Sequence, residues 1–207
     1  MNSTMPKRTP GRPKSSEQGS SMRETILNAA SLLFMEYGYE PVSINQIADR
    51  AGATKASVYY YFSNKAQLFT VSVTEMMERI GSHTGRILRQ EGDLRSRLEE
   101  VARAKMAASH VEFESLMREA LPSLAKEQQE EIRRAEHGIH EVLAAFFEEA
   151  IRRGEIKSSF SPMLLAHAFS SLLMMGNRES DLAEETEGEP LSRRLVDLFW
   201  QGVGPPG

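Results

Sequence analysis

Side chains that can bind phosphates and base edges are concentrated between residues 43 and 65. Lys55, Ser57 and Tyr60 place a cation, a hydroxyl and a phenol within one short segment. Such groups donate hydrogen bonds to phosphate oxygens and to the edges of bases. The chemistry expected of this stretch is recognition of a nucleic acid, because none of these side chains is accompanied by partners that would activate it for catalysis.

Two short helices are expected to position these side chains. The first begins at Ser43, a good N-cap residue, and ends at Gly52, which accepts a positive φ. The second is capped by Thr54 and runs through Tyr61. A small core beneath a preceding helix at 21–37 would be closed by Ile47, Ala48, Ala51, Val58 and Phe62. The outer surface of the second helix would then suit the major groove, and it carries Lys55, Ala56, Ser57, Tyr59 and Tyr60.

The stretch from Gly38 to Leu68 resembles the DNA-binding domain of the TetR/AcrR family of transcriptional regulators. The resemblance covers about residues 22–70 of the 207. It is specific because the elements Ile47-Ala48…Ala51-Gly52, Tyr59…Phe62 and Asn64-Lys65 occur together in order. Two positions depart from the family pattern: Ala56 replaces a common Gly or Pro, and Ala66 replaces a common acid. The first departure leaves the base preference open.

The resemblance implies a role for individual residues. Contacts with backbone phosphates are implied for Ser43, Tyr59, Tyr61 and Lys65. Contacts with base edges are implied for Asn45, Lys55, Ala56, Ser57 and Tyr60. Lys55 could donate to guanine and Ala56 could touch a thymine methyl group, whereas Tyr61 could equally be half inside the core. Arg12, in a basic arm expected to be disordered over residues 1–20, could enter a narrow minor groove, or the arm could simply aid solubility.

Charge and composition agree with an intracellular DNA-binding protein. The chain of 207 residues has a net charge of −4, but residues 1–70 carry eight Lys and Arg against five Asp and Glu. Cysteine is absent, and no apolar run approaches the ~20 residues that span a bilayer. Neither a G-x-S-x-G element, a Walker loop nor H-E-x-x-H is present. We therefore expect a cytoplasmic protein that is not an enzyme and holds no cofactor or metal.

Apolar periodicity predicts an all-α fold of about nine helices. A helix-turn-helix domain is expected at 21–66, a ligand-binding and dimerisation domain at 67–201, and a frayed tail at 202–207. Ser63 is expected to cap a fourth helix, 63–80, that joins the two domains. The later helices are expected at 93–109, 112–120, 123–153, 161–177 and 191–201.

The resemblance also implies a ligand pocket among the later helices. Pliable or aromatic residues and two histidines are the candidate lining: Met76, Met106, His110, Phe113, Met117, Phe146, Phe147, His167 and Met174. The alternative is that these residues form an ordinary bundle core. His137 and His140 are expected to lie on a solvated helix face rather than to bind a metal.

Helices 161–177 and 191–201 are expected to pair with their copies across a twofold axis. The interface residues predicted are Ala166, Phe169, Ser170, Leu173, Leu195, Leu198 and Phe199; the alternative is packing within one chain. The family resemblance implies a homodimeric repressor that leaves an inverted-repeat operator when a small, lipophilic ligand tilts helix 63–80. Ligand-dependent activation and control by a protein partner are the rival modes.

Overall fold

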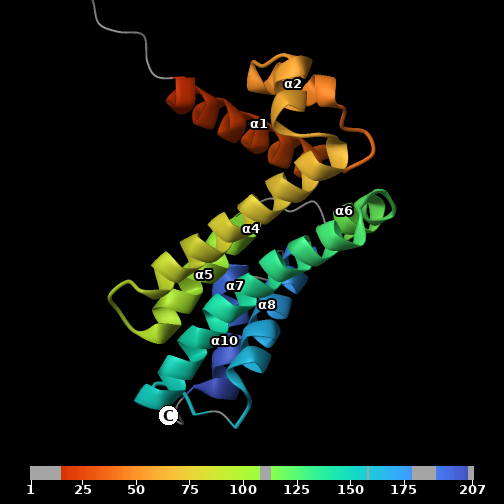
Figure 1. Ribbon diagram of the computed structural model, residues 1–207. Helices are drawn as coiled ribbons and strands as arrows, with labels where there is room; N and C mark the ends of the chain where they lie inside the picture. The colour runs from red at the N-terminus through yellow and green to blue at the C-terminus, as the bar shows by residue number, and fades with distance from the viewer. Residues whose placement is uncertain (1–14, 108–112, 158, 179–189, 205–207) are drawn as a thin grey trace, which may run out of the picture.

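The computed structural model describes residues 15–107, 113–157, 159–178 and 190–204 (Figure 1). Within these ranges the chain is helical and contains no strand, which confirms the predicted all-α fold. The elements are α1 (Ser15–Tyr37), α2 (Ile44–Ala51), α3 (Lys55–Tyr61), α4 (Lys65–Leu88), α5 (Leu94–Ala107), α6 (Phe113–Ala120), the 3-10 turn η1 (Leu121–Ser123), α7 (Lys126–Arg153), α8 (Pro162–Arg178) and α10 (Leu191–Val203). None of these helices is long and apolar enough to span a bilayer.

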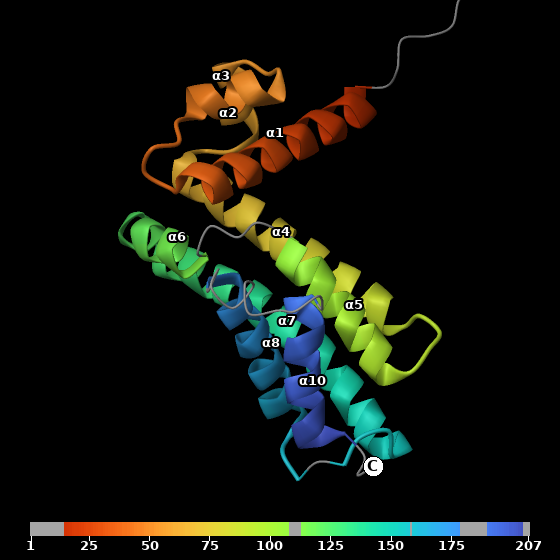
Figure 2. The ribbon, with the colours of Figure 1, turned by 180° about the vertical axis from the view of Figure 1, so that it is seen from behind.

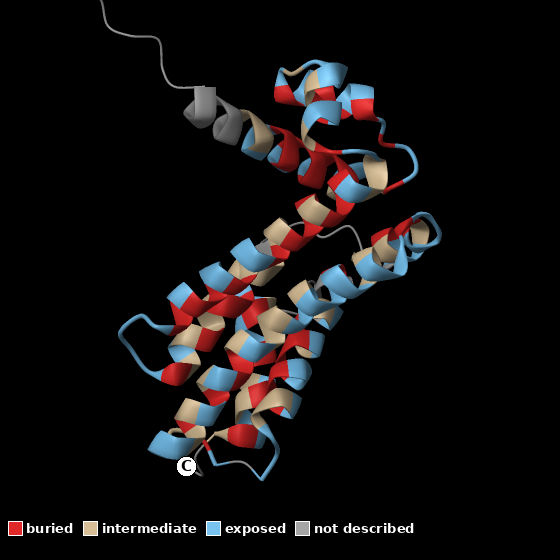
Figure 3. Cartoon of the chain, viewed as in Figure 1, coloured by how far each residue is buried: buried red, intermediate tan, exposed pale blue. Residues whose placement is uncertain are grey.

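The helices form two groups joined by α4. Helices α1 to α3 gather at one end, and α4 runs from them into a bundle with α5, α7, α8 and α10 (Figures 1 and 2). The buried positions follow this division and form two clusters (Figure 3). The first cluster joins α1 to α3 with the start of α4 and also includes Leu116 and Ala120 of α6. Helix α6 therefore packs with the N-terminal group, although it follows α5 in the chain.

The start of each short helix is fixed by a polar side chain. In α2, the Ser43 hydroxyl accepts from the Gln46 backbone N–H at 3.2 Å, and the Gln46 side chain accepts from the Ser43 N–H at 2.7 Å. Thr54 caps α3 by accepting from the backbone N–H of Ser57 at 3.0 Å. These two caps are the ones expected from the sequence.

Three predicted helix limits differ from the structure. Helix α1 begins at Ser15 and not at Ser21, so the arm predicted to be disordered over residues 1–20 is too long. Asn64, not Ser63, caps α4, because its side chain accepts from the Gln67 N–H at 2.8 Å. Helix α4 also continues to Leu88, beyond the predicted end at Ile80.

A break separates α6 from α7 at the predicted boundary, and α7 begins at Lys126 rather than at residue 123. Pro122 lies in the first turn of the 3-10 turn η1, where a missing N–H costs nothing. Ala125 then adopts an extended conformation, with φ of −63° and ψ of 156°, and α7 begins after it. The redirected chain lets α7 run back along α4 through the bundle (Figure 1).

Candidate nucleic-acid interface

Helix α3 exposes a continuous polar surface above a buried apolar side. Val58 is fully buried and Phe62 is 3% exposed, so both belong to the core as predicted. Lys55 and Ala56 are exposed on the opposite side of α3, whereas Ser57 is half-buried. The hydroxyl of Ser57 lies 2.8 Å from that of Thr54, so each hydroxyl can orient the other. The first turn of α3 thus presents a cation, a methyl group and two hydroxyls together.

Three consecutive tyrosines complete this surface. Tyr60 is 82% exposed and Tyr59 is 47% exposed, an unusual degree of exposure for large aromatic side chains. Tyr61 is half-buried and packs edge-on against Tyr60, with ring centroids 4.9 Å apart. The half-core alternative therefore describes Tyr61, and its ring supports the exposed Tyr60.

Helix α2 holds α3 through a tight turn. Gly52 has φ of 60° and ψ of 31°, the left-handed conformation predicted for it. The N–H of Ala53 donates to the Ala48 carbonyl at 2.9 Å, which satisfies an otherwise free helix end. Asn45 and Ser43 are exposed at the start of α2, on the same helix-turn-helix unit. Ser43 accepts a hydrogen bond as the N-cap, and its O–H group can still donate to a phosphate.

Lys65 is more constrained than a free surface lysine. Its Nζ donates to the Glu40 carbonyl at 3.1 Å and lies 4.3 Å from the centroid of the Tyr39 ring. Burial lowers the pKa of the ammonium group, and the charges of Glu40 and Glu119 oppose that shift. Lys65 therefore links the start of α4 to the turn between α1 and α2, besides any contact with phosphate. Arg12, the remaining predicted contact, lies outside the described residues.

The geometry of this unit can be compared with known proteins. The model of the family described as "Bacterial regulatory proteins, tetR family" matches residues 26–71, which include the whole α2–α3 unit and its supporting helices. Residues 26–71 thus form a domain of the TetR family. The helix-turn-helix within it is the family's DNA-binding unit, as the motif around Gly52 predicts.

Curated relatives match this TetR-family domain. The regulator LmrA of Bacillus subtilis is 48% identical over 59 residues, covering 28% of this chain and 31% of the relative. The transcriptional activator FasR of Mycolicibacterium smegmatis is 36% identical over 76 residues, covering 37% and 35%. The chain matches about a third of the length of these relatives. These relatives are regulators and not enzymes, in keeping with the lack of catalytic motifs in the sequence.

A solved structure extends the similarity to the whole fold. The transcriptional regulator FadR of Bacillus subtilis, solved in complex with stearoyl-CoA, has a TM-score of 0.66. It is 19% identical and covers 86% of this chain and 98% of its own. At this identity the two chains share a fold, and the similarity says nothing about a ligand.

The residues predicted to line a ligand pocket do not gather around one described cavity. Phe113 and Met117 pack against the first core, whereas Met106 and Phe146 pack against the second. Phe147 is 1% exposed and is a core residue. Met76 and Met174 are half-buried, His167 is exposed, and His110 lies outside the described residues. The core alternative thus holds for Phe147, and the predicted lining is divided between two clusters.

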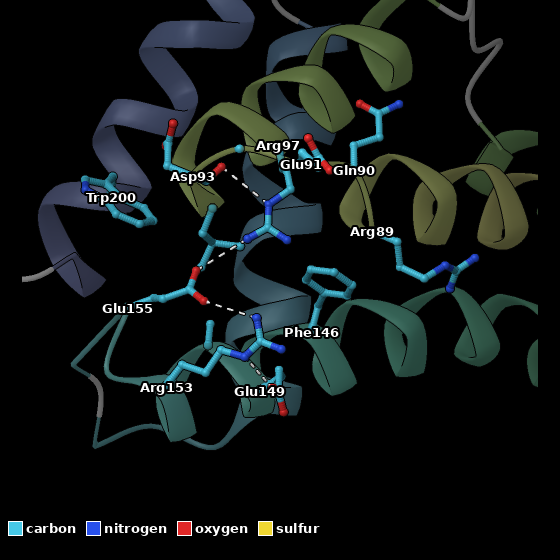
Figure 4. Close-up of a pocket in the computed structure, with 13 residues that line it drawn as sticks. Arg89, Gln90, Glu91, Asp93, Arg97, Phe146, Glu149, Arg153, Glu155 and Trp200 are labelled. Atoms are coloured by element: carbon cyan, nitrogen blue, oxygen red, sulfur yellow. Dashed lines mark hydrogen bonds and ion pairs between the residues drawn. The ribbon is translucent and has the colours of Figure 1, made fainter.

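One described pocket, of about 800 Å³, lies at the end of the bundle farthest from α3. It is open to solvent and contains Phe146 and Trp200 together with charged side chains. Figure 4 shows Arg97 and Arg153 directed at Glu155, with separations of 3.4 and 3.8 Å. Because Arg97, Glu149, Arg153 and Glu155 form ion pairs with one another, this part of the site is a structural network that joins α5 to the end of α7. Of the predicted lining, it contains Phe146 alone.

A second open pocket, of about 950 Å³, is a groove between α4 and α7. Small residues make it possible: Gly81, Gly85 and Gly138 contribute no side chain there. Its rim is charged, with Glu78 and Arg134 among the lining residues. None of the residues predicted to bind a ligand lines this groove.

A cluster of basic side chains lies where α5, α7 and α8 meet. The rings of His140 and His167 contact each other at an interplanar angle of 32°, with centroids 4.1 Å apart. Burial lowers the pKa of His140 to about 4, and the charges of His167, Lys105 and His137 act in the same direction. Burial also lowers the pKa of Lys105, against the influence of Glu136. The prediction that His140 lies on a solvated face is therefore wrong, because α8 partly covers it.

His137 does lie on the exposed face and pairs with Glu141 at 3.6 Å. Among the described residues, no three His, Asp or Glu side chains are close enough together to hold a metal ion. His167 is one of the predicted lining residues, but its contact with His140 has no signal in the sequence, because it depends on the packing of α7 against α8.

The predicted dimer residues are mostly inside the chain. Phe169, Leu173 and Ala166 are at most 1% exposed, and Ser170, Leu195 and Phe199 are also buried. Phe199 contacts Phe147 and Phe169 in the second core, with ring centroids 5.5 and 5.2 Å away. Packing within one chain, the stated alternative, accounts for these six residues. The prediction thus selected the apolar stripe that the chain buries in its own core.

The apolar surface that α8 and α10 expose to solvent is made mostly of other residues than the predicted interface. Leu198, at 55% exposed, is the one predicted interface residue that faces solvent. On α8, Leu164 is 52% exposed and Met175 is 42% exposed. Ala168 and Ser171 are exposed between them at helical spacing. We call Leu164, Ala168, Ser171, Met175 and Leu198 the outer α8–α10 face.

Proposed function

We propose that this TetR-family chain is a sequence-specific DNA-binding transcriptional regulator that acts in the cytoplasm as a homodimer. The observation that carries the proposal is the outer face of α3, which presents Lys55, Ser57 and Tyr60. The helix beneath this face is capped by Thr54 and packs on a buried core. Large aromatic groups and a free cation on a rigid helix are suited to groove edges and phosphates. The residues implied by the family resemblance supply the remaining contacts.

Selection of duplexes from a random library by the full chain tests the proposal. An enriched inverted repeat should appear, and its affinity should exceed that of scrambled DNA by about a thousandfold or more at physiological salt. Equal affinity for the enriched and scrambled duplexes would defeat the assignment.

The dimer is proposed to form through the outer α8–α10 face. An operator with twofold symmetry requires two recognition helices about 34–36 Å apart or a larger multiple. Leu164, Met175 and Leu198 offer an exposed apolar surface on α8 and α10, and these two helices lie away from α3 in Figure 2. A patch of this kind on a soluble helical protein is typical of an interface.

The mode of regulation is proposed to be repression relieved by a small lipophilic effector. Helix α4 starts beside α3 and continues to Leu88 in the bundle, so a ligand that tilts it would move the recognition helices. FadR of Bacillus subtilis was solved with stearoyl-CoA bound, which supports a lipophilic effector for a chain of this fold. In the part of the chain described, His167 is proposed to supply a polar contact to the effector, and its ring contacts that of His140.

A protein partner is the second candidate regulator. Both described pockets are open to solvent and have charged rims, which favours a surface ligand over an enclosed one. Ligand-dependent activation is the second candidate mode, and FasR is by name an activator. Operator affinity measured against a panel of acyl-CoA esters and against a host lysate separates these possibilities.

A further inference from the structure

The turn between α1 and α2 is held by a side chain from α6. The carboxylate of Glu119 accepts the backbone N–H of Tyr39 at 3.1 Å and that of Glu40 at 2.7 Å. Lys65 donates to the carbonyl of the same turn, at Glu40. The carbonyl group of the turn is therefore bonded by Lys65 of α4, and the two N–H groups of the turn are bonded by Glu119 of α6. Hydrogen bonds to a carboxylate are among the stronger ones in proteins.

The approach of Glu119 requires a glycine at residue 38. Gly38 has φ of +87°, and a Cβ atom there would lie 2.6 Å from the Glu119 Oε2 atom. The next residue, Tyr39, is buried and packs edge-on against Phe69, with centroids 5.0 Å apart. Its hydroxyl interacts with Ser123 in η1. The α6–η1 segment thus grips the turn at its backbone and at the Tyr39 side chain.

Apolar packing fixes α6 in this position. Leu116 and Ala120 are almost fully buried in the first core, and Phe113 and Met117 pack against its edge. This makes α6 a second connection between the bundle and the DNA-binding domain, in addition to α4. Helix α2 begins at Ile44, shortly after the turn, so a displacement of the turn changes the direction in which α2 and α3 point.

We propose that Glu119 is a positioning residue that transmits the position of α6 to the recognition helix. The inference rests on the proposed DNA-binding function and deepens it. A discrete contact that is either made or broken gives the two arrangements that coupling between distant sites requires. While the bonds are made, the turn and α2 follow α6; once they are broken, the backbone of the turn is no longer tied to α6, although Leu116 and Ala120 still pack in the first core.

The test uses the full chain with Glu119→Ala and Glu119→Gln, and Glu127→Ala as the matched control. Glu127 is an exposed glutamate near the start of α7. Hydrogen exchange is measured at the amides of Tyr39 and Glu40, with the Phe62 amide, bonded to Val58 at 2.9 Å, as the marker of an intact α3. Affinity is then measured for the duplex enriched from the random library.

In Glu119→Ala the two turn amides should exchange about tenfold faster or more, while the Phe62 amide stays protected. DNA affinity should change by about fivefold or more. Glu119→Gln, which keeps one acceptor oxygen, should lie between Ala and the parent protein, and Glu127→Ala should match the parent.

Unchanged exchange at Tyr39 and Glu40 would overturn the contact itself. Faster exchange with unchanged DNA affinity would make Glu119 a structural residue only. The same conclusion would follow if Glu127→Ala changed DNA affinity as much as Glu119→Ala, or if the Phe62 amide lost its protection in Glu119→Ala. If the parent protein binds no duplex selectively, the proposed function fails too, and the exchange data still report whether the contact exists.

Discussion

At the scale of single residues, the side chains of the recognition surface differ in how far other parts of the chain hold them in place. Lys55 is exposed and unpaired among the described residues, whereas Lys65 is partly buried against Tyr39 and bonded to Glu40. A substitution at Lys65 would therefore alter both the turn and any phosphate contact. Lys55 is the cleaner probe of base recognition, because removing its ammonium group leaves the packing of α3 unchanged.

Lys55→Ala should lower affinity for the enriched duplex by about 1–3 kcal/mol, roughly 5- to 150-fold, with a smaller loss on scrambled DNA. A lysine that reads a base loses discrimination when it is removed, whereas one that binds phosphate weakens all sequences alike. Fluorescence anisotropy with both duplexes measures this. Lys126→Ala, at an exposed site on α7, is the control and should have no effect. Equal losses on both duplexes would assign Lys55 to phosphate.

His140 should make stability depend on pH. Its pKa is about 4 in the folded chain against an ordinary value of 6.5, so the unfolded chain binds the proton more tightly. Stability should therefore be full above pH 6.5 and fall as the pH drops toward 4. Partial solvent access reduces the loss to on the order of 1–2 kcal/mol.

Denaturant titration between pH 7 and 4 measures this fall in stability. His140→Gln should flatten the dependence, whereas His83→Gln, at an exposed position on α4, should retain it. A profile that is the same for the parent and His140→Gln would contradict the assignment. The neighbouring charges that act on His140 are His167, Lys105 and His137.

At the scale of the elements, short helices depend on their ends. Helices α2 and α3 are too short to be stable alone, so caps and the turn at Gly52 decide their geometry. Gly52 and Gly138 provide a matched pair, because a Cβ added at either meets no atom within 4 Å. They differ in conformation: Gly52 has φ of +60°, and Gly138 lies within α7.

Gly52→Ala should destabilise the chain by about 1–2 kcal/mol, because a Cβ is disfavoured in the left-handed conformation. Gly138→Ala should instead stabilise it by about 0.5–1 kcal/mol through helix propensity. Thermal unfolding followed by circular dichroism compares them. A stabilising Gly52→Ala would mean that the turn does not need a positive φ.

At the scale of the whole molecule, the packing of the helices decides which apolar residues lie in the core and which stay exposed on the surface. The outer α8–α10 face is the part of these helices left for a second copy, since Phe169, Leu173 and Phe199 are used internally. The same packing places α6 against the DNA-binding domain, so that two elements join the groups of helices. The outer α8–α10 face concerns how two copies are held together, and the contact of α6 concerns how a ligand in the bundle could move the recognition helices.

Leu164→Glu should convert the proposed dimer to a monomer and weaken operator binding by about tenfold or more, because a charge would be buried in an apolar interface. Light scattering at micromolar concentration provides the measurement. Leu32→Glu is the control: Leu32 is 56% exposed on α1, close to the 52% of Leu164. A dimer that persists in Leu164→Glu would rule out this face.

The sequence by itself determined the features that depend on local patterns. Apolar periodicity predicted the helices, and the positions of Gly52, Ser43 and Thr54 predicted a helix-turn-helix, because caps and positive φ values are decided within a few residues. Tertiary structure alone decided which apolar stripe is buried, so Phe169 and Phe199 lie in the core while Leu164 stays free. It also decided that His140 meets His167 and that Glu119 reaches Tyr39, eighty residues away. Periodicity shows that a helix has an apolar face, but only the packing of the other helices decides what that face touches.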